Sequence, residues 1–336
     1  MKSIKNIFLV ALSITVILMM SFQISAKNIQ NFPIKSTIYV DDDATYPGQG
    51  TLDFPYAKIR FAIENSSDND DIKIASGEYN ENILIDKELS LDWHGSDIIG
   101  TDTGKPIING NGIGIVVLIR ASDVVIKQCI ITNSGTTDLD AGIYIGEESF
   151  NVKILDDEIT NCFCGIWVNR ITPKETNHEI RGNIIDEIFQ QGMLISFSDS
   201  NSIYNNVISN CGWHGIHIRD CNENRIRENN ITNSEFGLII DVGQQNEVEL
   251  NTCENNVRWG FIVINTQKTV ITNNNFVNNG EGQATWINCR ANQWFQNYWG
   301  QTKFIFHIVG GTLRGADISI PWFKIELSPS PTRIVP

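Results

Sequence analysis

Three consecutive stretches of the sequence read NSIYNNVISNCGWHGIHIRDC from Asn201, NRIRENNITNSEFGLIIDV from Asn224 and NEVELNTCENNVRWGFIVI from Asn246. Aligned on one another, they define a repeat of about 23 residues, a period typical of solenoids. Apolar residues alternate with other residues over short runs such as GIHI and GLII, which predicts strands rather than helices. The repeat is therefore a unit of short strands and turns.

Four columns of residues recur once per unit and align the repeats. The apolar column predicts inward-facing strand positions, and the Gly column precedes a short strand. An Asn in a turn tolerates left-handed backbone geometry, and its amide can bond the same Asn one unit away. The columns are Ile180, Ile203, Ile226, Val248, Ile271 and Trp294 (apolar); Asn183, Asn206, Asn229, Asn251, Asn274 and Asn297 (first Asn); Asn133, Asn161, Asn210, Asn233, Asn255 and Asn278, broken by Glu187 (second Asn); and Gly142, Gly165, Gly192, Gly215, Gly237 and Gly260 (Gly).

Short strands separated by Asn and Gly turns, with each unit stacking on the next, predict an all-β, single-stranded parallel β-helix with coils about 4.8 Å apart. A β-sandwich with accidental periodicity is the alternative. Residues 56–64 (YAKIRFAIE) have an amphipathic helical pattern and predict a helix that caps the N-terminal end, while the tail with residues 320–323 (IPWF) predicts a cover for the other end. The predicted organisation is a leader at 1–26, a cap and first coils at 27–121, regular repeats at 122–300 and a C-terminal cap or tail at 301–336.

The first residues have the pattern of a secretory signal. Lys2 and Lys5 precede an apolar run at 7–22, and small residues follow at Ser25 and Ala26. The run is short for a membrane span of about 20 residues, so we expect cleavage near Ala26; an uncleaved anchor is the alternative. No later stretch is long and apolar enough to span a bilayer. We therefore expect a secreted or cell-surface protein, periplasmic in a Gram-negative cell.

The net charge of the chain limits the class of partner. The chain has 25 Lys and Arg against 39 Asp and Glu, a net charge of −14, and phosphate partners such as nucleic acids need positive charge. We therefore expect no nucleic-acid partner.

The seven cysteines are an odd number, and those at matching turn positions fall two or three coils apart, beyond the Cα reach of a disulfide, about 7 Å. Most are predicted to be small core residues.

A known family emerges from these stretches. The segment from Tyr39, YVDDDATYPGQGTLDFPYAKIRFAIENSSDNDDIKIASGEYNENILI, resembles the N-terminal cap of secreted right-handed β-helix proteins of the pectate-lyase-like group. The repeats are similar to the NosD-like, carbohydrate-binding-and-sugar-hydrolysis type, and the ending NYWG followed by IPWF resembles secreted archaeal and bacterial members. The resemblance, which covers about 38–326, implies a right-handed parallel β-helix. It is weak for activity, because that fold hosts lyases, hydrolases, epimerases and adhesins.

The outward positions next to the Gly column predict the candidate site. Aromatic faces, amides, a His pair and an Arg on one side are typical of a sugar-binding surface, so we expect a polysaccharide or cell-surface glycan as partner. A solvated sheet face, with Arg219 paired to Asp241 one coil away, is the alternative. The predicted binding residues are Tyr144, Trp167, Asn169, Gln191, Ser196 and Asp241, and the candidate catalytic residues are His217, Arg219 and His214.

Catalysis on this face would follow one of two routes. Hydrolysis needs two carboxylates about 5 to 9.5 Å apart, and the acids here, Asp140, Glu235 and Asp241, lie farther apart along the coils or the strand. Elimination or epimerisation of a uronic acid needs a base and a group that neutralises the carboxylate, which a His and Arg219 would supply. The first hypothesis is therefore non-catalytic carbohydrate recognition, and a polysaccharide lyase or epimerase is the alternative.

The residues themselves offer two possible metal sites. Residues three apart in an extended strand lie roughly 10 Å apart and point to opposite faces, so His214 and His217 make a copper pair only if Gly215 turns the chain. The run 41–43 (DDD) is a candidate Ca²⁺ site through Asp41 and Asp43, with a solvated acidic loop as the alternative. A NosD-like accessory role in copper-site maturation, implied by the resemblance alone, is the second functional alternative.

Overall fold

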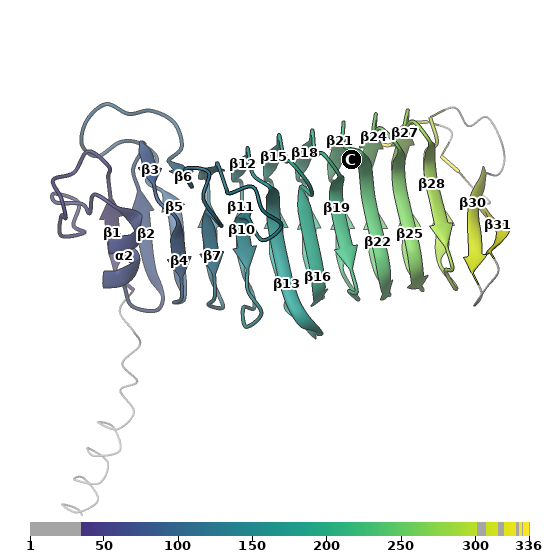
Figure 1. The fold of residues 1–336 in the computed structure, drawn as a ribbon, viewed down its shortest axis with the longest axis horizontal. Helices are drawn as coiled ribbons and strands as arrows, with labels where there is room; N and C mark the ends of the chain where they lie inside the picture. The colour runs from purple at the N-terminus through teal and green to yellow at the C-terminus, as the bar shows by residue number, and fades with distance from the viewer. Residues whose placement is uncertain (1–34, 301–306, 315–318, 327–328, 331, 336) are drawn as a thin grey trace, which may run out of the picture. The chain divides into compact units, whose positions relative to one another are not determined.

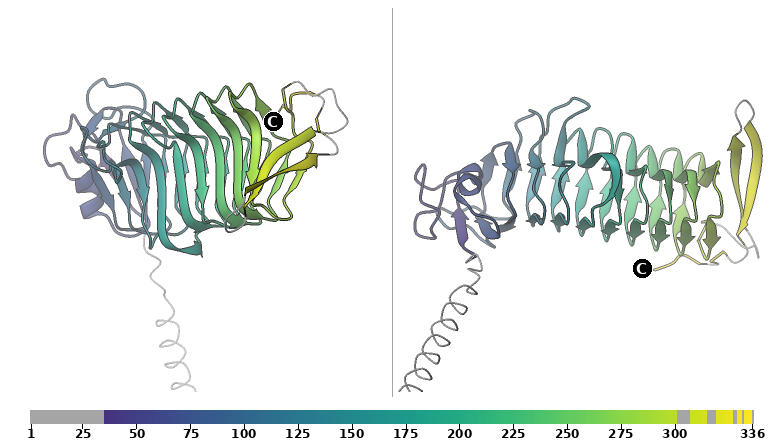
Figure 2. Two further views of the ribbon diagram at one scale, coloured as in Figure 1. Left: turned by 45° about the vertical axis from the view of Figure 1, so that its right-hand side comes forward. Right: turned by 90° about the horizontal axis from the view of Figure 1, so that it is seen from below.

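The computed structural model describes residues 35–300, 307–314, 319–326, 329–330 and 332–335. The chain divides into two units, 1–36 and 37–336, and the expected leader at 1–26 lies outside the described residues. The second unit is nearly all β, with strands that stack coil on coil (Figures 1 and 2). Within the described ranges, no helix has the length and apolar character needed to cross a membrane.

Three sheets run along the second unit, and successive strands of the chain visit sheets A, B and C in turn. Sheet A consists of β1 (Thr37–Val40), β2 (Asp70–Ile74), β5 (Leu89–Trp93), β8 (Val125–Lys127), β11 (Lys153–Leu155), β14 (Glu179–Arg181), β17 (Ser202–Tyr204), β20 (Arg225–Arg227), β23 (Glu247–Glu249), β26 (Val270–Thr272) and β29 (Gln293–Phe295). Sheet B consists of β3 (Glu78–Asn80), β6 (Ile107–Asn109), β9 (Ile130–Thr132), β12 (Glu158–Thr160), β15 (Ile184–Asp186), β18 (Val207–Ser209), β21 (Asn230–Thr232), β24 (Thr252–Glu254) and β27 (Asn275–Val277). Sheet C consists of β4 (Ile83–Ile85), β7 (Val117–Ile119), β10 (Ala141–Ile145), β13 (Cys164–Glu175), β16 (Met193–Asp199), β19 (His214–Arg219), β22 (Phe236–Gln244), β25 (Trp259–Gln267), β28 (Gly282–Ile287), β30 (His307–Arg314) and β31 (Ser319–Glu326).

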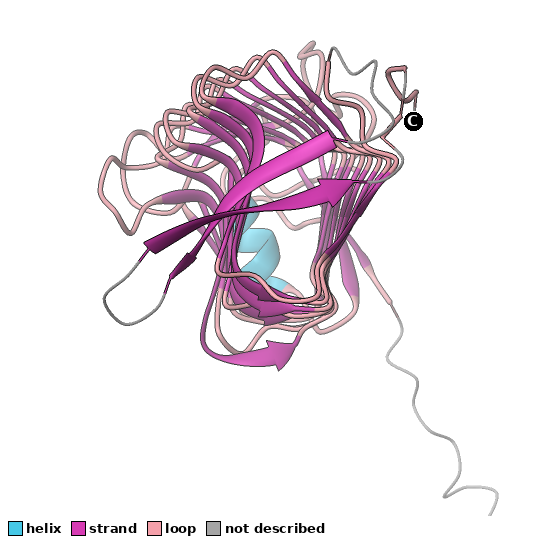
Figure 3. Cartoon of the chain, turned by 90° about the vertical axis from the view of Figure 1, so that its right-hand side faces the viewer, coloured by secondary structure: helices cyan, strands magenta, loops and turns pink. Residues whose placement is uncertain are grey.

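The predicted parallel β-helix is confirmed. In the apolar column, Ile203 pairs in register with Ile180 on one side and Ile226 on the other, and all three side chains are fully buried. Figure 3, viewed from the C-terminal side, shows the coils superimposed around one interior. That interior is filled mainly by Ile and Val from all three sheets, because β-branched side chains fit a pleated, buried surface.

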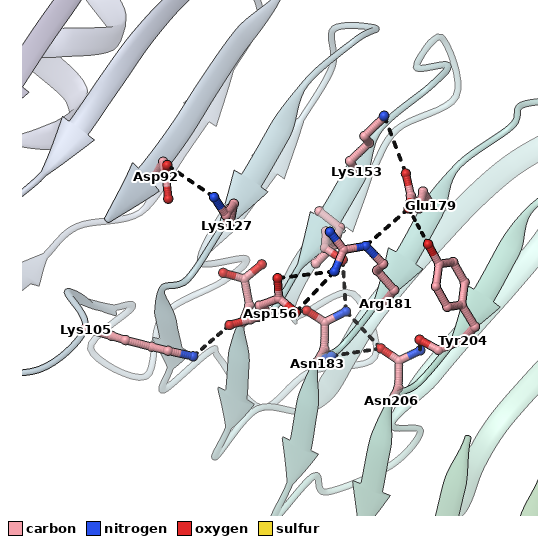
Figure 4. Close-up of polar contacts among 12 residues, drawn as sticks. Asp92, Lys105, Lys127, Lys153, Asp156, Glu179, Arg181, Asn183, Tyr204 and Asn206 are labelled. Atoms are coloured by element: carbon pink, nitrogen blue, oxygen red, sulfur yellow. Dashed lines mark hydrogen bonds and ion pairs between the residues drawn. The ribbon is translucent and has the colours of Figure 1, made fainter. Parts of the chain in front are cut away.

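The first Asn column forms a hydrogen-bonded ladder inside the turn between sheets A and B. The backbone N–H and the Nδ2 of Asn206 both donate to Oδ1 of Asn229, at 3.1 and 2.9 Å, and Asn183 donates to Asn206 in the same way (Figure 4). The left-handed backbone belongs instead to the second Asn column, where Asn161 and Asn210 have φ of 51° and 52°. The two properties expected of turn Asn residues are thus divided between the two columns.

The Gly column marks a place where successive coils approach closely. A Cβ added to Gly165 would lie 2.4 Å from the carbonyl oxygen of Gly192 in the next coil. A contact that short requires the backbone to shift, so a larger residue here would separate the coils. The column therefore fixes the corner from which the strands of sheet C begin.

The N-terminal end of the coil is covered by a helix, as predicted. Helix α2 (Ile59–Asn65) begins three residues later than the amphipathic pattern does, and its Ile59, Ala62 and Ile63 are buried. The Glu81 carboxylate accepts the N–H groups of Ile59 and Arg60, which satisfies donors that a helix N-terminus leaves free. At the other end, β30 and β31 pair with each other antiparallel and β30 extends sheet C beside β28.

The outer face of sheet A is a strip of paired charges. Arg181 contacts Asp156 and Glu179, and Glu179 also pairs with Lys153 and accepts a hydrogen bond from Tyr204 (Figure 4). These groups satisfy one another, which is typical of a solvated structural face. The seven cysteines are unpaired and buried, in agreement with their prediction as core residues.

Candidate functional site

The outer face of sheet C carries the predicted ladder of side chains. Tyr144 of β10 pairs in register with Trp167 of β13, which pairs with Leu194 of β16, which pairs with His217 of β19. The strand spacing places these four side chains in a row, about 4.8 Å apart. We call this row, Tyr144, Trp167, Leu194 and His217, the ladder face.

An aromatic pair forms the N-terminal half of the ladder face. The rings of Tyr144 and Trp167 meet edge to face with centroids 5.1 Å apart, and the Asn169 Nδ2 donates to the Tyr144 hydroxyl at 2.9 Å. The Trp167 Nε1 has no hydrogen-bond partner among the described residues. A hollow of about 550 Å³ lies beside Tyr144 and another of about 290 Å³ beside Trp167 and Leu194. The pair is therefore flanked by space on both sides.

The His pair differs from the sequence prediction. The rings of His214 and His217 touch, with centroids 4.7 Å apart, instead of pointing to opposite faces. The reason is that His214 is the first residue of β19, next to the turn, where the alternation of side chains has not begun. Its ring packs on Trp213 and against Phe236.

Burial keeps both histidines uncharged near neutral pH. It is the main cause that lowers the pKa of His214 to about 3 and that of His217 to about 4, because a low-dielectric environment disfavours the imidazolium. Neither ring nitrogen of His217 has a hydrogen-bond partner among the described residues. His217 is thus a neutral imidazole whose two ring nitrogens are buried.

Beyond β19 the face changes character. Arg219 lies beside Asp241 in register, as predicted, but its ion pair is with the adjacent Asp220 at 3.5 Å. Burial and the nearby Asp220 charge raise the pKa of Asp241. The following coils carry a small apolar cluster of Phe236, Ile239 and Ile262 on the outside of the sheet, so the polar and aromatic part of the face ends near Asp241.

The predicted site residues differ in how much surface they offer. Gln191, Ser196 and His214 are buried, so they support the face from below. Tyr144, Trp167, Asn169, His217, Arg219 and Asp241 keep exposed surface. The structure therefore brings the predicted residues to one side of the protein but leaves six of the nine accessible.

The sequence analysis missed the turn between sheets B and C. Phe163, Gln190 and Trp213 from this turn line the hollow beside Trp167, together with Asp138 from the loop before β10. The available signal was the spacing from the second Asn column to the Gly column: nine residues from 133 to 142, four from 161 to 165 and five from 187 to 192 and from 210 to 215. Extra residues in one turn project outward, because the strands on either side keep their register.

The acidic run near the N-terminus is used by the backbone. The Asp41 carboxylate accepts N–H groups of Asp43, Ile98 and Ile99 at 2.9, 3.1 and 2.7 Å. Over the part of the chain that the structure describes, no three His, Cys, Asp or Glu side chains are grouped so as to hold a metal ion. The Asp41 carboxylate, considered from the sequence as a Ca²⁺ ligand together with Asp43, is thus occupied by backbone N–H groups.

Comparison with known proteins places this architecture among parallel β-helix proteins. XylC with xylose is similar over 76% of this chain and 70% of that chain, at 12% identity and a TM-score of 0.61. The A-module of the mannuronan C-5 epimerase AlgE4 of Azotobacter vinelandii covers 77% and 78%, at 16% identity and a TM-score of 0.55, and pectate lyase Pel9A covers 78% of both chains, at 10% identity and a TM-score of 0.53. At such identities the likeness concerns the fold alone.

The family follows from the sequence match. Residues 63–314 match the family described as "Periplasmic copper-binding protein (NosD)", and the chain belongs to this NosD family. A search of curated protein sequences finds no match.

The described side chains do not fit a copper centre. Soft sulfur ligands are typical of copper sites, but Met193 is fully buried and burial raises the pKa of Cys162 to about 11 and of Cys211 to about 12. His178 is buried and its Nδ1 accepts the N–H of Val152. The touching rings of His214 and His217 remain two ligands without a third.

Proposed function

We propose that this protein is a secreted or cell-surface module that recognises a glycan along the ladder face without transforming it. The observation that carries the proposal is the half-buried Tyr144–Trp167 pair, flanked by hollows of about 550 and 290 Å³. Aromatic faces stack on the apolar faces of sugar rings, while a neighbouring polar group such as Asn169 binds hydroxyls.

The setting of the face supports a glycan over a compact ligand. The ladder is linear and runs along the axis of the coil, and each hollow is open to solvent rather than enclosed. The structural neighbours include proteins whose names mention xylose, mannuronan and pectate. The family description as periplasmic agrees with a location outside the cytoplasm.

A polysaccharide lyase or epimerase is the second candidate, favoured by His217. Its imidazole belongs to the ladder face, and Arg219 lies two residues further along the same strand, but both ring nitrogens of His217 are buried. Against this role, burial lowers the pKa of His217 to about 4, and a general base works best with a pKa near the operating pH. The geometry therefore supports binding better than proton abstraction.

The test is isothermal titration of the mature chain with neutral and uronic oligosaccharides, with ultraviolet absorbance recorded for unsaturated products. We expect binding without products, weakened about tenfold in Trp167→Ala, because one stacking partner is lost. The matched control is Phe295→Ala, an exposed aromatic of sheet A, which should bind like the wild type. Products that disappear in His217→Gln would replace the binding role with the lyase, and equal affinity in Trp167→Ala would refute the ladder face.

A further inference from the structure

A third hollow, larger than the two beside Tyr144 and Trp167, lies at the edge of the ladder face. It has a volume of about 800 Å³ and lies over the turn between sheets B and C, lined by residues from several successive coils. It shares Phe163, Gln190 and Trp213 with the smaller hollow beside Trp167. Because the two hollows share these residues, a ligand bound on the ladder face would extend directly into the larger hollow.

A missing side chain creates the hollow. Across successive coils, one turn position holds Phe163, Phe189, Gly212 and Glu235, as the backbone hydrogen bonds between coils place them. Phe163 and Phe189 stack with centroids 5.4 Å apart, but Gly212 leaves the next place empty. A Cβ on Gly212 would lie 2.2 Å from the carbonyl oxygen of Phe189, so the backbone itself requires the gap.

The walls of the hollow are exposed aromatic rings. Phe189 is 72% exposed and Trp213 is 43% exposed, whereas large aromatic side chains are usually highly buried. Phe163 holds Phe189 by stacking, and His214 lies against Trp213 with ring centroids 4.3 Å apart. Both rings are thus held in place while their outer faces remain free, as a stacking platform for a sugar requires.

The charged residues that line the hollow, Glu187 and Glu235, are both acidic. Arg258 is not among the lining residues; it lies 3.8 Å from Glu235 and pairs more closely with Glu281. Carboxylates accept hydrogen bonds from hydroxyl groups and repel another carboxylate. Glu187 and Glu235 stand two coils apart, roughly 10 Å by strand spacing.

From these observations we infer that the hollow formed by Phe163, Phe189, Trp213, Glu187 and Glu235 is a second glycan subsite, selective for an uncharged pyranose over a uronate. The inference rests on the proposed glycan recognition and specifies the class of sugar. One ring of the glycan stacks on Phe189 and Trp213, and its hydroxyls donate to the two carboxylates. The adjoining rings continue along Trp167.

The experiment measures dissociation constants by isothermal titration with tetrasaccharides from xylan, mannan, cellulose and chitin, and with tetragalacturonate. Wild type should bind at least one neutral tetrasaccharide at least tenfold more tightly than tetragalacturonate. Phe189→Ala should weaken the neutral ligand about tenfold, whereas Phe54→Ala, an exposed Phe (62%) in the N-terminal cap, should not. Glu187→Gln combined with Glu235→Gln should narrow the preference against tetragalacturonate by at least tenfold, a change that a structural role would not produce.

The variants separate this subsite from the ladder face. Loss of affinity in Trp167→Ala with unchanged affinity in Phe189→Ala overturns the subsite and leaves the proposed function standing. The reverse pattern supports the subsite and sinks the ladder face. A wild type that prefers tetragalacturonate, or that binds none of the neutral ligands, overturns the subsite outright.

Discussion

Asp157 stands at the N-terminal end of the first Asn ladder, and replacing it with Asn should stabilise the protein at neutral pH. Its N–H donates to Asn183 Oδ1 and its own Oδ1 accepts the N–H of Cys129, as a ladder Asn would. Its Oδ2 therefore takes the place of the amide nitrogen, which in Asn183 donates to Ile154 O and Asn206 Oδ1. An ionised oxygen cannot donate, and this Oδ2 is buried without a partner in the described structure.

The magnitude follows from the pKa. Burial is the main cause that raises the pKa of Asp157 from 3.8 to about 8, so the folded protein binds a proton that the unfolded chain releases above pH 3.8. The stabilisation from this group is complete below pH 3.8 and is lost as the pH rises toward 8. At pH 7 the loss is about 4 kcal/mol, from roughly three pH units at 1.36 kcal/mol each. At pH 5 it is between 1 and 2 kcal/mol by the same rule, on the order of a third as much.

The assay is urea unfolding followed by far-ultraviolet circular dichroism at pH 5, 7 and 8. Asp157→Asn supplies a donor without the need to bind a proton, so its gain over the wild type should grow from pH 5 to pH 8. The matched control is Asp123→Asn, an exposed carboxylate with φ of 58°, which changes the net charge equally and should give no pH-dependent gain. A gain of the same size at all three pH values, or a loss at pH 8, would refute the reasoning.

Three further outcomes follow from the ladder, the core and the His pair. Asn229→Ala should lower the free energy of unfolding by about 3 kcal/mol, since it leaves buried amides unpaired, while Asn233→Ala at an exposed turn should cost about 1 kcal/mol; equal losses in urea titrations would contradict the ladder's importance. In a thiol-reagent assay, none of the seven buried cysteines should react in the folded protein and all should react in denaturant, so rapid labelling of folded protein would argue against their burial. The folded pKa values of His214 and His217 lie below the unfolded value, so the free energy of unfolding should fall as the pH drops from about 6.5 to 4. NMR signals of these two imidazoles that titrate near pH 6.5 would show this to be wrong.

The coil and its register could be predicted because each unit repeats the same physical solution. Ile203 has the same neighbours as Ile226, so an alignment of the sequence on itself gives the pairing of strands. The orientation of His214 could not be predicted in this way, because its position depends on the turn that precedes β19. The hollow at Gly212 could not be predicted for the same reason. The strands repeat, whereas turn lengths differ from coil to coil, and an alignment on one average repeat length does not show these differences.

The regular stacking of sheet C also sets the distance between equivalent side chains of successive coils. Each coil offers one side chain per ladder position, so the proposed binding groups form a row with a spacing of about 4.8 Å. A polymer whose repeat length matches a multiple of that spacing can engage several coils at once, and its contacts add. In a polymer with another repeat length, the rings no longer lie over the side chains of successive coils after a few units, however well any single ring fits. Selection by such a surface therefore acts on the monomer spacing of a chain as well as on the chemistry of its units.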